Sequence, residues 1–309
     1  MSQAPRYAYL GPSGTFTEAA LLSLPEADRI EGVPCPSVPA AFDAVRSGDC
    51  DAAVAAMESS VEGAVTATID ELASGEPLMI VRELLLPISF ALLVRPGTEL
   101  AAVKTVASHP VAMPQCRRWL GQRLPDARWE TAASNAEAAR QVSEGQFDAA
   151  LAGAFTAARY GLEVLADGIH DNLGAQTRFV VVTRPGAPAA PTGLDKTSVT
   201  VGLRDNHPGE LMEILEEFAG RGVNLSRIES RPTGEAMGKY YFLIDCEGHV
   251  LDERVGEALL GLRRNSAHLR FLGSYQRADR QPPSIRPGTT DAEFAAAREW
   301  LAAVRGGNR

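Results

Sequence analysis

The sequence predicts an α/β protein with two lobes, followed by a smaller domain of the order β-α-β-β-α-β. Three observations lead to this prediction. Short apolar runs alternate with helical patterns over residues 6–184, a Pro/Gly/Ala-rich stretch follows at 185–193, and a second alternation fills residues 197–276. At 309 residues the chain is long enough for two or three domains, each with its own core.

The first lobe is expected to contain residues 6–83 together with 174–184. A short apolar strand at 7–10 and a Gly-Pro-Ser-Gly loop come first, and Thr15 or Thr17 then caps a helix. The further elements are a strand at 51–56, a helix at about 66–73 and a strand rich in β-branched residues at 179–183.

The second lobe is expected to span residues 84–173. Because the chain leaves the first lobe and returns to it at 179–183, crossing segments should join the lobes, with a cleft between them. The predicted elements are strands at 84–94, 105–108 and 148–152 and helices at 115–124 and 134–142.

A linker at 185–196 separates these lobes from a domain at 197–276, whose element order is that of the ferredoxin-like plan. The tail, 277–309, is polar and Pro-rich before a short helix at 291–304, with Phe294, Trp300, Leu301 and Val304 as a possible docking face. In the ferredoxin-like domain we expect strands at 198–203, 223–230, 240–245 and 269–275 and helices at 209–219 and 253–263.

Composition narrows the class of protein. The net charge of −9 gives no general attraction for nucleic acid or an anionic membrane, so an anionic small-molecule substrate would need local positive groups. The four cysteines form no Cys-x-x-Cys pair, as in reduced cytosolic proteins. The chain starts without a signal-peptide pattern, and its longest charge-free apolar run, 84–94, contains Pro87 and is too short for a bilayer. We therefore expect a cytoplasmic protein without a nucleic-acid or membrane partner.

Thr177, Arg178 and Phe179 stand where a polar turn enters the apolar run that follows them. Arginine can bind a carboxylate through two parallel hydrogen bonds, and a threonine hydroxyl can donate to a leaving oxygen. A strand start would hold both groups rigidly, as a catalytic pair requires. Taken alone, the tripeptide also suits an ordinary edge strand with a solvated arginine.

Five sequence blocks, taken in order along the chain, favour the catalytic interpretation of residues 177–179. Together these blocks resemble the prephenate dehydratase family. Residues 209–212 (Gly-Glu-Leu-Met) and 229–232 (Glu-Ser-Arg-Pro) also resemble a phenylalanine-sensing ACT domain. The resemblance covers roughly residues 6–276. The family blocks are Tyr9-Leu10-Gly11-Pro12-Ser13-Gly14-Thr15-Phe16-Thr17-Glu18, Glu58-Ser59-Ser60-Val61-Glu62-Gly63, Ser108-His109-Pro110, Ser134-Asn135-Ala136-Glu137-Ala138-Ala139 and Thr177-Arg178-Phe179.

The resemblance implies a periplasmic-binding-protein-like catalytic domain with a cleft, joined to an ACT regulatory domain. It implies the decarboxylating dehydration of prephenate to phenylpyruvate in L-phenylalanine biosynthesis, under feedback control by phenylalanine. The enzyme would be a carbon-oxygen lyase that works as a homodimer or homotetramer. Neither a metal nor an organic cofactor is implied, and the sequence shows no His/Cys ligand cluster and no Walker loop.

Residue roles follow from the same resemblance. Thr177 would assist departure of the hydroxyl, Arg178 would anchor a carboxylate and Phe179 would pack beside them. Most other candidates also have a structural interpretation. The loop, serine and asparagine positions could be helix caps, and His109, next to Ser108, could be a structural residue at a strand end. The implied substrate-binding residues are Ser13, Gly14, Thr15, Ser59, Ser60, Gly63, Ser108 and Asn135.

The ACT-like domain would bind phenylalanine at the interface between paired ACT domains. The alternative is that this segment only drives dimerisation. Gly209 would permit close backbone approach at a helix start. The implied effector-binding residues are Gly209, Leu211, Asn224, Leu225, Glu229, Ser230 and Arg231.

Four positions depart from the family pattern. Ser59 and Ala175 stand where Asn is usual or frequent, Asn135 where Thr is common, and Glu210 where Ala is usual. The first two changes could weaken substrate binding, and Glu210 adds a charge beside the implied effector site. Two other functions therefore stay open: a prephenate decarboxylase that leaves the ring non-aromatic, and a non-catalytic aromatic amino-acid sensor. Retention of residues 177–179 and of the regulatory domain argues against the decarboxylase.

Overall fold

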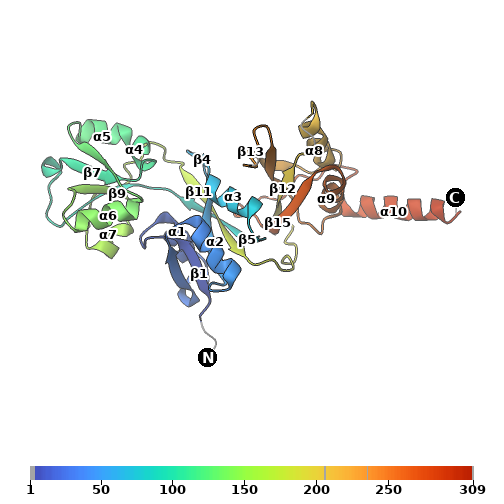
Figure 1. The fold of residues 1–309 in the computed structure, drawn as a ribbon, viewed down its shortest axis with the longest axis horizontal. Helices are drawn as coiled ribbons and strands as arrows, with labels where there is room; N and C mark the ends of the chain where they lie inside the picture. The colour runs from blue at the N-terminus through green and yellow to red at the C-terminus, as the bar shows by residue number, and fades with distance from the viewer. Residues whose placement is uncertain (1–3, 205–206, 235, 308–309) are drawn as a thin grey trace. The chain divides into compact units, whose positions relative to one another are not determined.

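The computed structural model describes residues 4–204, 207–234 and 236–307. The chain divides into two compact units, Met1–Thr68 with Leu84–Val181 and Ile69–Glu83 with Val182–Arg309. Three β-sheets are present in the described residues, and the helices flank them (Figure 1). The α/β fold class predicted from the sequence is confirmed.

The first sheet has the strand order β2-β1-β3-β11-β5, with β4 paired to β3. Strand β1 runs parallel to both β2 and β3. Tyr9, Val54, Phe179 and Val181 form part of its buried core. The elements are β1 (Arg6–Leu10), α1 (Phe16–Leu22), η1 (Ala27–Arg29), β2 (Glu31–Cys35), α2 (Val38–Ser47), β3 (Ala52–Ser59), β4 (Gly63–Ala64), α3 (Thr66–Ser74), β5 (Met79–Pro87) and β11 (Gln176–Thr183).

The second sheet has the strand order β10-β6-β9-β7-β8, with a hydrophobic cluster on each face. Helices α4 and α5 lie on one side of it and α6 and α7 on the other (Figure 1). One cluster includes Cys116 and Leu120 from the α4–α5 side, and the other includes Ala139 and Val142 of α6. The elements are β6 (Ala91–Val94), η2 (Leu100–Ala102), β7 (Thr105–Ser108), α4 (Ala112–Gln115), α5 (Arg117–Arg123), β8 (Arg128–Thr131), α6 (Asn135–Ser143), β9 (Ala149–Ala152), α7 (Thr156–Tyr160) and β10 (Glu163–Ala166).

The strand predicted at 84–94 is in fact two strands. Strand β5 ends at Pro87 in the first sheet, and β6 begins at Ala91 in the second. Proline cannot donate to a ladder of hydrogen bonds, so it interrupts the run. The 84–94 stretch is thus itself a crossing between the two sheets.

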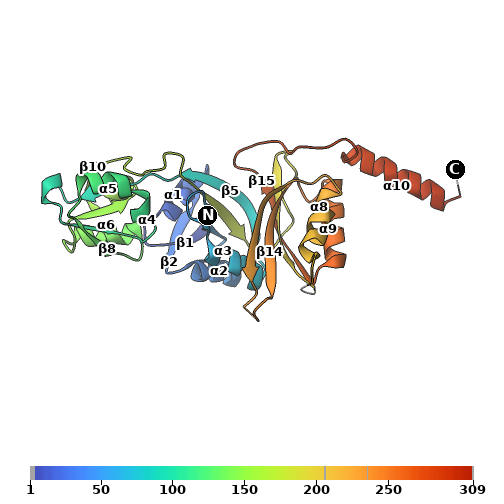
Figure 2. The same cartoon turned by 90° about the horizontal axis from the view of Figure 1, so that it is seen from above.

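The third sheet is antiparallel, with the order β13-β14-β12-β15, and it confirms the predicted ferredoxin-like plan. Helices α8 and α9 cover one face of this sheet (Figure 2). Val199, Ile214, Phe218 and Ile244 pack together in its core. The elements are β12 (Asp195–Gly202), α8 (Glu210–Ala219), β13 (Leu225–Pro232), β14 (Tyr240–Glu247), α9 (Glu253–Asn265), β15 (His268–Gln276) and, in the tail, α10 (Asp291–Arg305).

Residues 69–83 belong to the same compact unit as this third sheet, although the sequence interpretation assigned them to the first lobe. Arg270 of β15 donates through Nη1 to the carbonyls of Leu72 and Gly75, at 3.1 and 2.7 Å, at the end of α3. Gly273, with φ +141°, lies so close to Ile80 that a Cβ atom there would stand 2.1 Å from its carbonyl oxygen. This close approach is a tertiary contact that no local sequence pattern predicts.

Within the described residues, no helix is long and apolar enough to cross a membrane.

Candidate active site

Strand β11 places Thr177, Arg178 and Phe179 in sequence at its start. Phe179 is 1% exposed in the core of the first sheet, Arg178 is 4% exposed and Thr177 is half-buried. Neighbouring side chains of a strand leave it on opposite faces. Thr177 and Arg178 therefore start from opposite sides of β11, which differs from the side-by-side pair that the sequence interpretation expected.

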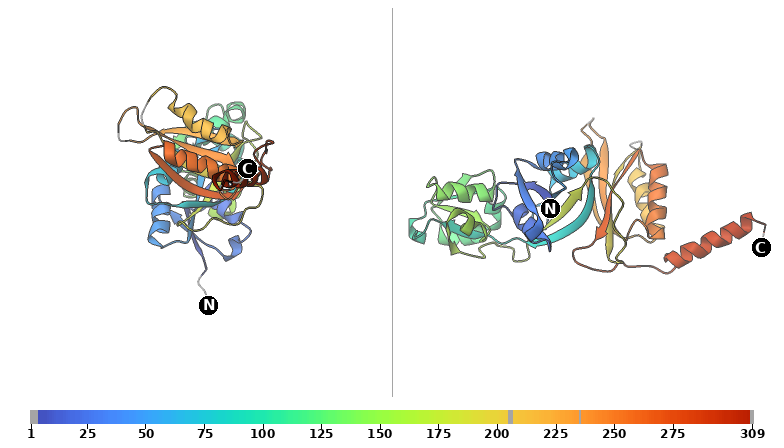
Figure 3. Two further views of the ribbon diagram at one scale, coloured as in Figure 1. Left: turned by 90° about the vertical axis from the view of Figure 1, so that its right-hand side faces the viewer. Right: turned by 90° about the horizontal axis from the view of Figure 1, so that it is seen from below.

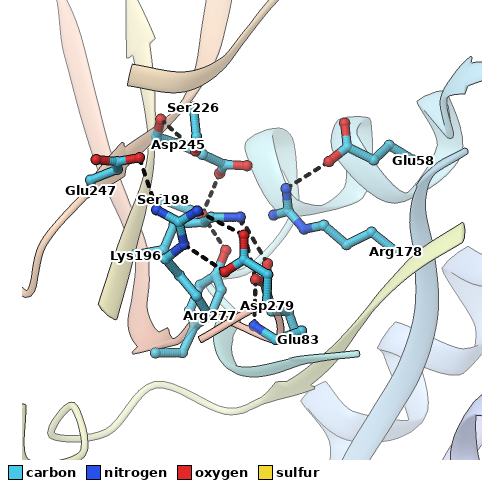
Figure 4. A network of polar contacts seen from close by, with 12 residues as sticks. Glu58, Glu83, Arg178, Lys196, Ser198, Ser226, Asp245, Glu247, Arg277 and Asp279 are labelled. Atoms are coloured by element: carbon cyan, nitrogen blue, oxygen red, sulfur yellow. Dashed lines mark hydrogen bonds and ion pairs between the residues drawn. The ribbon is translucent and has the colours of Figure 1, made fainter. Parts of the chain in front are cut away.

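The charge of Arg178 is balanced by Glu58, near the end of the adjacent strand β3. Nη1 of Arg178 donates to Oε1 of Glu58 at 2.9 Å, and the two side chains point toward each other (Figure 4). The arginine side chain is 4% exposed and the glutamate 34%. A buried guanidinium requires such a partner because an unpaired buried charge is costly. Glu58 was not among the predicted site residues, although its place in a family block was a signal.

The loop after β3 fixes the start of β11. Ser60 N–H donates to the carbonyl of Gln176 at 2.9 Å, and Gln176 N–H donates to Ser60 Oγ at 3.0 Å. Ser59 Oγ accepts from the amides of Val61 and Glu62. Gly63, at φ +80°, pairs with Ser59 across the short β3–β4 ladder. In this structure these three predicted substrate-binding residues hold the loop next to the residue that precedes Thr177.

The loop from Ser13 to Thr15 is tied to α1. Gly14 N–H donates to Oε2 of Glu18 at 2.5 Å, and Thr15 Oγ1 accepts from Glu18 N–H at 3.2 Å as the N-cap of α1. Tyr9 OH donates to Oε1 of Glu18 at 3.0 Å, and burial raises the pKa of Tyr9 to about 12. The Gly14 amide, which the sequence interpretation offered to an anion, is directed at Glu18, and Thr15 has the structural role named as its alternative.

Helix α7 connects this loop to the lobe of the second sheet, within the same compact unit. Thr156 Oγ1 donates to the carbonyl of Gly14 at 2.8 Å, and Tyr160 OH donates to the carbonyl of Ser13 at 2.6 Å. Arg159 Nη2 also donates to Glu18 Oε1 at 2.8 Å. The two lobes therefore meet at the Ser13–Thr15 loop.

Ser108 and Asn135 lie at the ends of elements in the second sheet's lobe. Asn135 Oδ1 accepts from His109 N–H at 2.9 Å, so it joins the loop after β7 to the start of α6. The N-cap of α6 is Ser134, whose Oγ accepts from Glu137 N–H at 3.0 Å. Ser108 is 3% exposed, and burial lowers the pKa of His109.

A cavity of about 630 Å³ opens beside these loops. Its lining comes from the β1–α1, β2–α2 and β8–α6 connections and includes Ser13, Thr15, Ser134 and Glu137. Neither Thr177 nor Arg178 is among the described residues that line this cavity. The predicted substrate residues thus do not form one cluster: Ser13 and Thr15 line this cavity, Ser59, Ser60 and Gly63 lie near the start of β11, and Ser108 and Asn135 lie at the ends of β7 and α6.

The predicted effector residues also fall into two groups, at the start of α8 and along the edge strand β13. Gly209, at φ +99°, precedes α8, and Leu211 is partly exposed. Asn224 accepts through its carbonyl from Glu247 N–H, and Leu225 packs against the core. Glu229 and Ser230 follow in β13.

Arg231 is engaged with α3. Its Nε and Nη2 donate to the two carboxylate oxygens of Asp70 at 3.0 and 2.7 Å, and Tyr241 OH donates to Asp70 Oδ1 at 2.8 Å. Burial alone would raise the pKa of Asp70, but the hydrogen bonds from Arg231 and Tyr241 outweigh it, so that pKa is lower than usual. Glu210 points inward: it is 6% exposed and accepts from Arg204 N–H.

In the ranges that the structure describes, no group of three or more His, Cys, Asp and Glu side chains could hold a metal ion.

A two-lobed α/β unit with a buried arginine–carboxylate pair, followed by a ferredoxin-like domain, has the architecture of the periplasmic-binding-protein-like class with an added C-terminal module. The family model for prephenate dehydratase matches residues 7–187, and the model for the ACT domain matches residues 197–264. The chain belongs to the prephenate dehydratase family and carries an ACT domain.

Three relatives illustrate the relationship. A prephenate dehydratase of Mycobacterium tuberculosis is 46% identical over 98% of this chain and 94% of its own length. The crystal structure of a prephenate dehydratase from Arthrobacter aurescens in complex with L-Phe has 50% identity and a TM-score of 0.94, covering 97% of this chain and 99% of that one. A quorum-quenching acylase has 28% identity and a TM-score of 0.78, covering 89% and 100%.

Proposed function

We propose that this enzyme is a lyase that converts prephenate to phenylpyruvate, with loss of carbon dioxide and water. The observation on which the proposal rests is the buried Arg178 at the start of β11, paired with Glu58 in a member of this family. In the reaction the electron pair of the bond to the ring carboxylate moves into the ring. The carbon–oxygen bond to the ring hydroxyl breaks, and that oxygen leaves with a proton as water.

Arg178 would bind a substrate carboxylate in place of Glu58. Guanidinium and carboxylate match as a two-point pair, and Arg178 Nη1 already donates to Oε1 of the Glu58 carboxylate. Glu58 thus keeps the guanidinium charge compensated and directed until the anionic substrate arrives. Substrate binding then exchanges one carboxylate for another instead of stripping water from a bare charge.

Thr177 would donate a hydrogen bond to the departing hydroxyl. A threonine hydroxyl is a weak acid, so its contribution depends on fixed position more than on acidity. The paired hydrogen bonds between Ser60 and Gln176 support that position, because they hold the residue immediately before Thr177. The opposite starting faces of Thr177 and Arg178 mean that each would meet a different part of the substrate.

Phenylalanine would act as the effector at the ACT domain, in a cytoplasmic homodimer or homotetramer. The L-Phe complex of the Arthrobacter aurescens relative supports this assignment. Helix α3 offers a route for coupling: Thr68 donates to the carbonyl of Ala56 in β3 at 2.6 Å, and Asp70 binds Arg231 of β13. An effector that shifts β13 would bias α3, and with it the strand that carries Glu58.

The test is turnover of prephenate by the purified full chain, with the product identified and with phenylalanine added or omitted. Phenylpyruvate as the product, formed more slowly with phenylalanine, is the expected result. A non-aromatic dihydro product would mean a decarboxylase, and phenylalanine binding without any product would mean a sensor. Because a related fold belongs to an acylase, hydrolysis of an N-acyl amide without prephenate turnover would also overturn the proposal.

A further inference from the structure

Helix α10 in the tail is an amphipathic arm without a buried residue. Ten of its fifteen residues are apolar by sequence, yet Trp300 is 68%, Val304 51% and Leu301 38% exposed. At 100° per residue, Phe294, Leu301, Val304 and Trp300 share one face of the helix. A helix of this length is marginal in water unless packing covers its apolar face. Another surface must therefore pack against this face for the helix to be stable.

The first turn of α10 is anchored to α9. Thr290 and Glu293 form a capping box, and Asp291 accepts through Oδ1 from the Glu253 amide at 2.9 Å. Arg298 binds the Glu253 carboxylate with both terminal nitrogens. Beyond this anchor the helix extends away from α8 and α9 (Figure 3).

A groove that fits such an arm lies beside the anchor. It has a volume of about 370 Å³ and is lined by Glu253, Gly256, Glu257, Leu259 and Leu260 of α9, together with Arg298. Leu260 is 56% exposed, and Gly256 leaves room for another helix to approach α9 closely. Glu257 places an acidic group at the groove, and Arg305 places a basic group next to Val304 at the end of the arm.

Among the described residues, α10 lines the groove of its own chain through Arg298 alone, and its apolar end from Trp300 to Val304 lies beyond it. Trp300 lies nine residues after the anchor at Asp291, or about 14 Å along a straight helix at 1.5 Å per residue. Returning to the groove at its base would require breaking α10. A second copy of the chain has no such constraint, and a two-fold exchange would place each arm in the partner's groove.

We propose that the apolar face of α10, from Trp300 to Val304, docks in the α9 groove of a second copy of this chain. The contact is reciprocal, with leucine and glycine of the groove facing the apolar residues of the arm and Glu257 facing Arg305. This surface is separate from the effector residues on β13 and at the start of α8, and the proposal does not depend on the catalytic assignment.

Association of the full-length chain tests the proposal. In sedimentation across a range of concentrations, Leu301→Glu and Leu260→Glu should each raise the dissociation constant at least tenfold. Ala302→Glu, one residue along and about 100° round α10 from Leu301, lies outside the apolar face; it is the matched control and should stay within about twofold of the unsubstituted chain. Equal dissociation constants for Leu301→Glu and Ala302→Glu would overturn the proposal.

A disulfide experiment identifies the occupant of the groove. Cys50, Cys116 and Cys246 are buried, so replacing Cys35 by serine leaves few reactive thiols. Mixing a Val304→Cys chain with a Leu260→Cys chain under mild oxidation should give a cross-linked dimer, whereas Ala302→Cys should not. A Val304→Cys/Leu260→Cys chain that closes a bond within itself at high dilution would show that the arm folds back, and would refute the exchange.

Discussion

Two arginine–carboxylate pairs in this protein are built from the same chemical groups but differ in burial and geometry. Arg178 is 4% exposed and donates through Nη1 to Oε1 of Glu58, whereas Arg231 is 22% exposed and binds both oxygens of Asp70. Tyr241 adds a third hydrogen bond to Asp70. A two-point contact with an added donor suits a permanent joint. A buried arginine paired with a glutamate that is 34% exposed suits a site where an incoming carboxylate replaces the glutamate.

The largest expected effect lies beside the first pair. Thr177→Ala should lower kcat by roughly 10²–10⁴-fold, the usual contribution of a positioned proton donor, with little change in KM. The free energy of unfolding should hardly change, because Thr177 is only half-buried. Steady-state kinetics with prephenate measure the split. Thr177→Ser, which keeps the hydroxyl, should retain most of the activity, and equal losses in kcat and in affinity would contradict the assigned role.

The next effect concerns a buried pair in the C-terminal unit. Lys196 Nζ lies 3.0 Å from Glu83 Oε2, and the side chains are 10% and 3% exposed (Figure 4). Lys196→Met should lower the free energy of unfolding by about 3–5 kcal/mol, because it leaves a buried carboxylate without its cation.

Urea denaturation measures this loss, and the double change Lys196→Met/Glu83→Met should recover most of it. A double variant as unstable as the single one would show that packing, and not charge, dominates. The activity per folded molecule should stay near that of the unsubstituted enzyme, in contrast to Thr177→Ala.

A smaller effect is expected at the second arginine pair. Asp70→Asn should cost about 1 kcal/mol or less at pH 7, because the Asp70 side chain is 46% exposed and solvent screens the pair. The pKa of Asp70 is lowered in the folded state, so its contribution is present above the unfolded value near 4 and is lost as the pH falls through the folded value.

Unfolding of both proteins between pH 7 and pH 3 measures this difference, which should shrink toward the acid end. Asp43→Asn removes a comparable carboxylate, 70% exposed and paired with Arg46, and serves as a control with no expected effect on phenylalanine inhibition. If α3 couples the effector site to β3, Asp70→Asn should weaken that inhibition while Asp43→Asn leaves it intact. Identical inhibition curves for the two variants would argue against coupling through α3.

The smallest effect is expected at His109, in the same unit as Arg178. Burial lowers its pKa, so the folded state binds its proton less readily than the unfolded chain. Its contribution to stability is therefore present above about pH 6.5 and declines as the pH falls. His109→Gln should leave kcat within about twofold and should flatten this decline in unfolding experiments from pH 7 to pH 5. A large loss of kcat would give His109 a catalytic part.

The sequence predicted those features that local patterns and ordered blocks encode. The strand at 179–183, the ferredoxin-like order and the family blocks all led to the correct architecture. Strand β2 was missed because Glu-Gly-Val-Pro-Cys is an exposed edge strand that contains Gly32 and Pro34, both unfavourable in strands.

The parts of the site that the sequence did not predict depend mostly on contacts between residues far apart in the chain. Glu58 and Arg178 are 120 residues apart, and Asp70 and Arg231 are 161 apart, so neither pairing has a local signal. The opposite faces of Thr177 and Arg178, in contrast, follow from the two-residue period of a strand and were predictable. The sequence interpretation placed the two groups on the right strand but overlooked its alternation.

Glu18 receives hydrogen bonds from its own sheet, from the neighbouring loop and from the opposing lobe, through Tyr9, Gly14 and Arg159. Tyr9 and Gly14 belong to the same lobe as Glu18, whereas Arg159 belongs to the lobe of the second sheet. If the lobes separate, the hydrogen bonds from Thr156, Arg159 and Tyr160 have to break, whereas those that Glu18 accepts from Tyr9 and Gly14 can persist and keep the loop assembled. Closing the lobes again would then require the loop to dock but not to refold. The conformational entropy lost in each catalytic cycle therefore stays small.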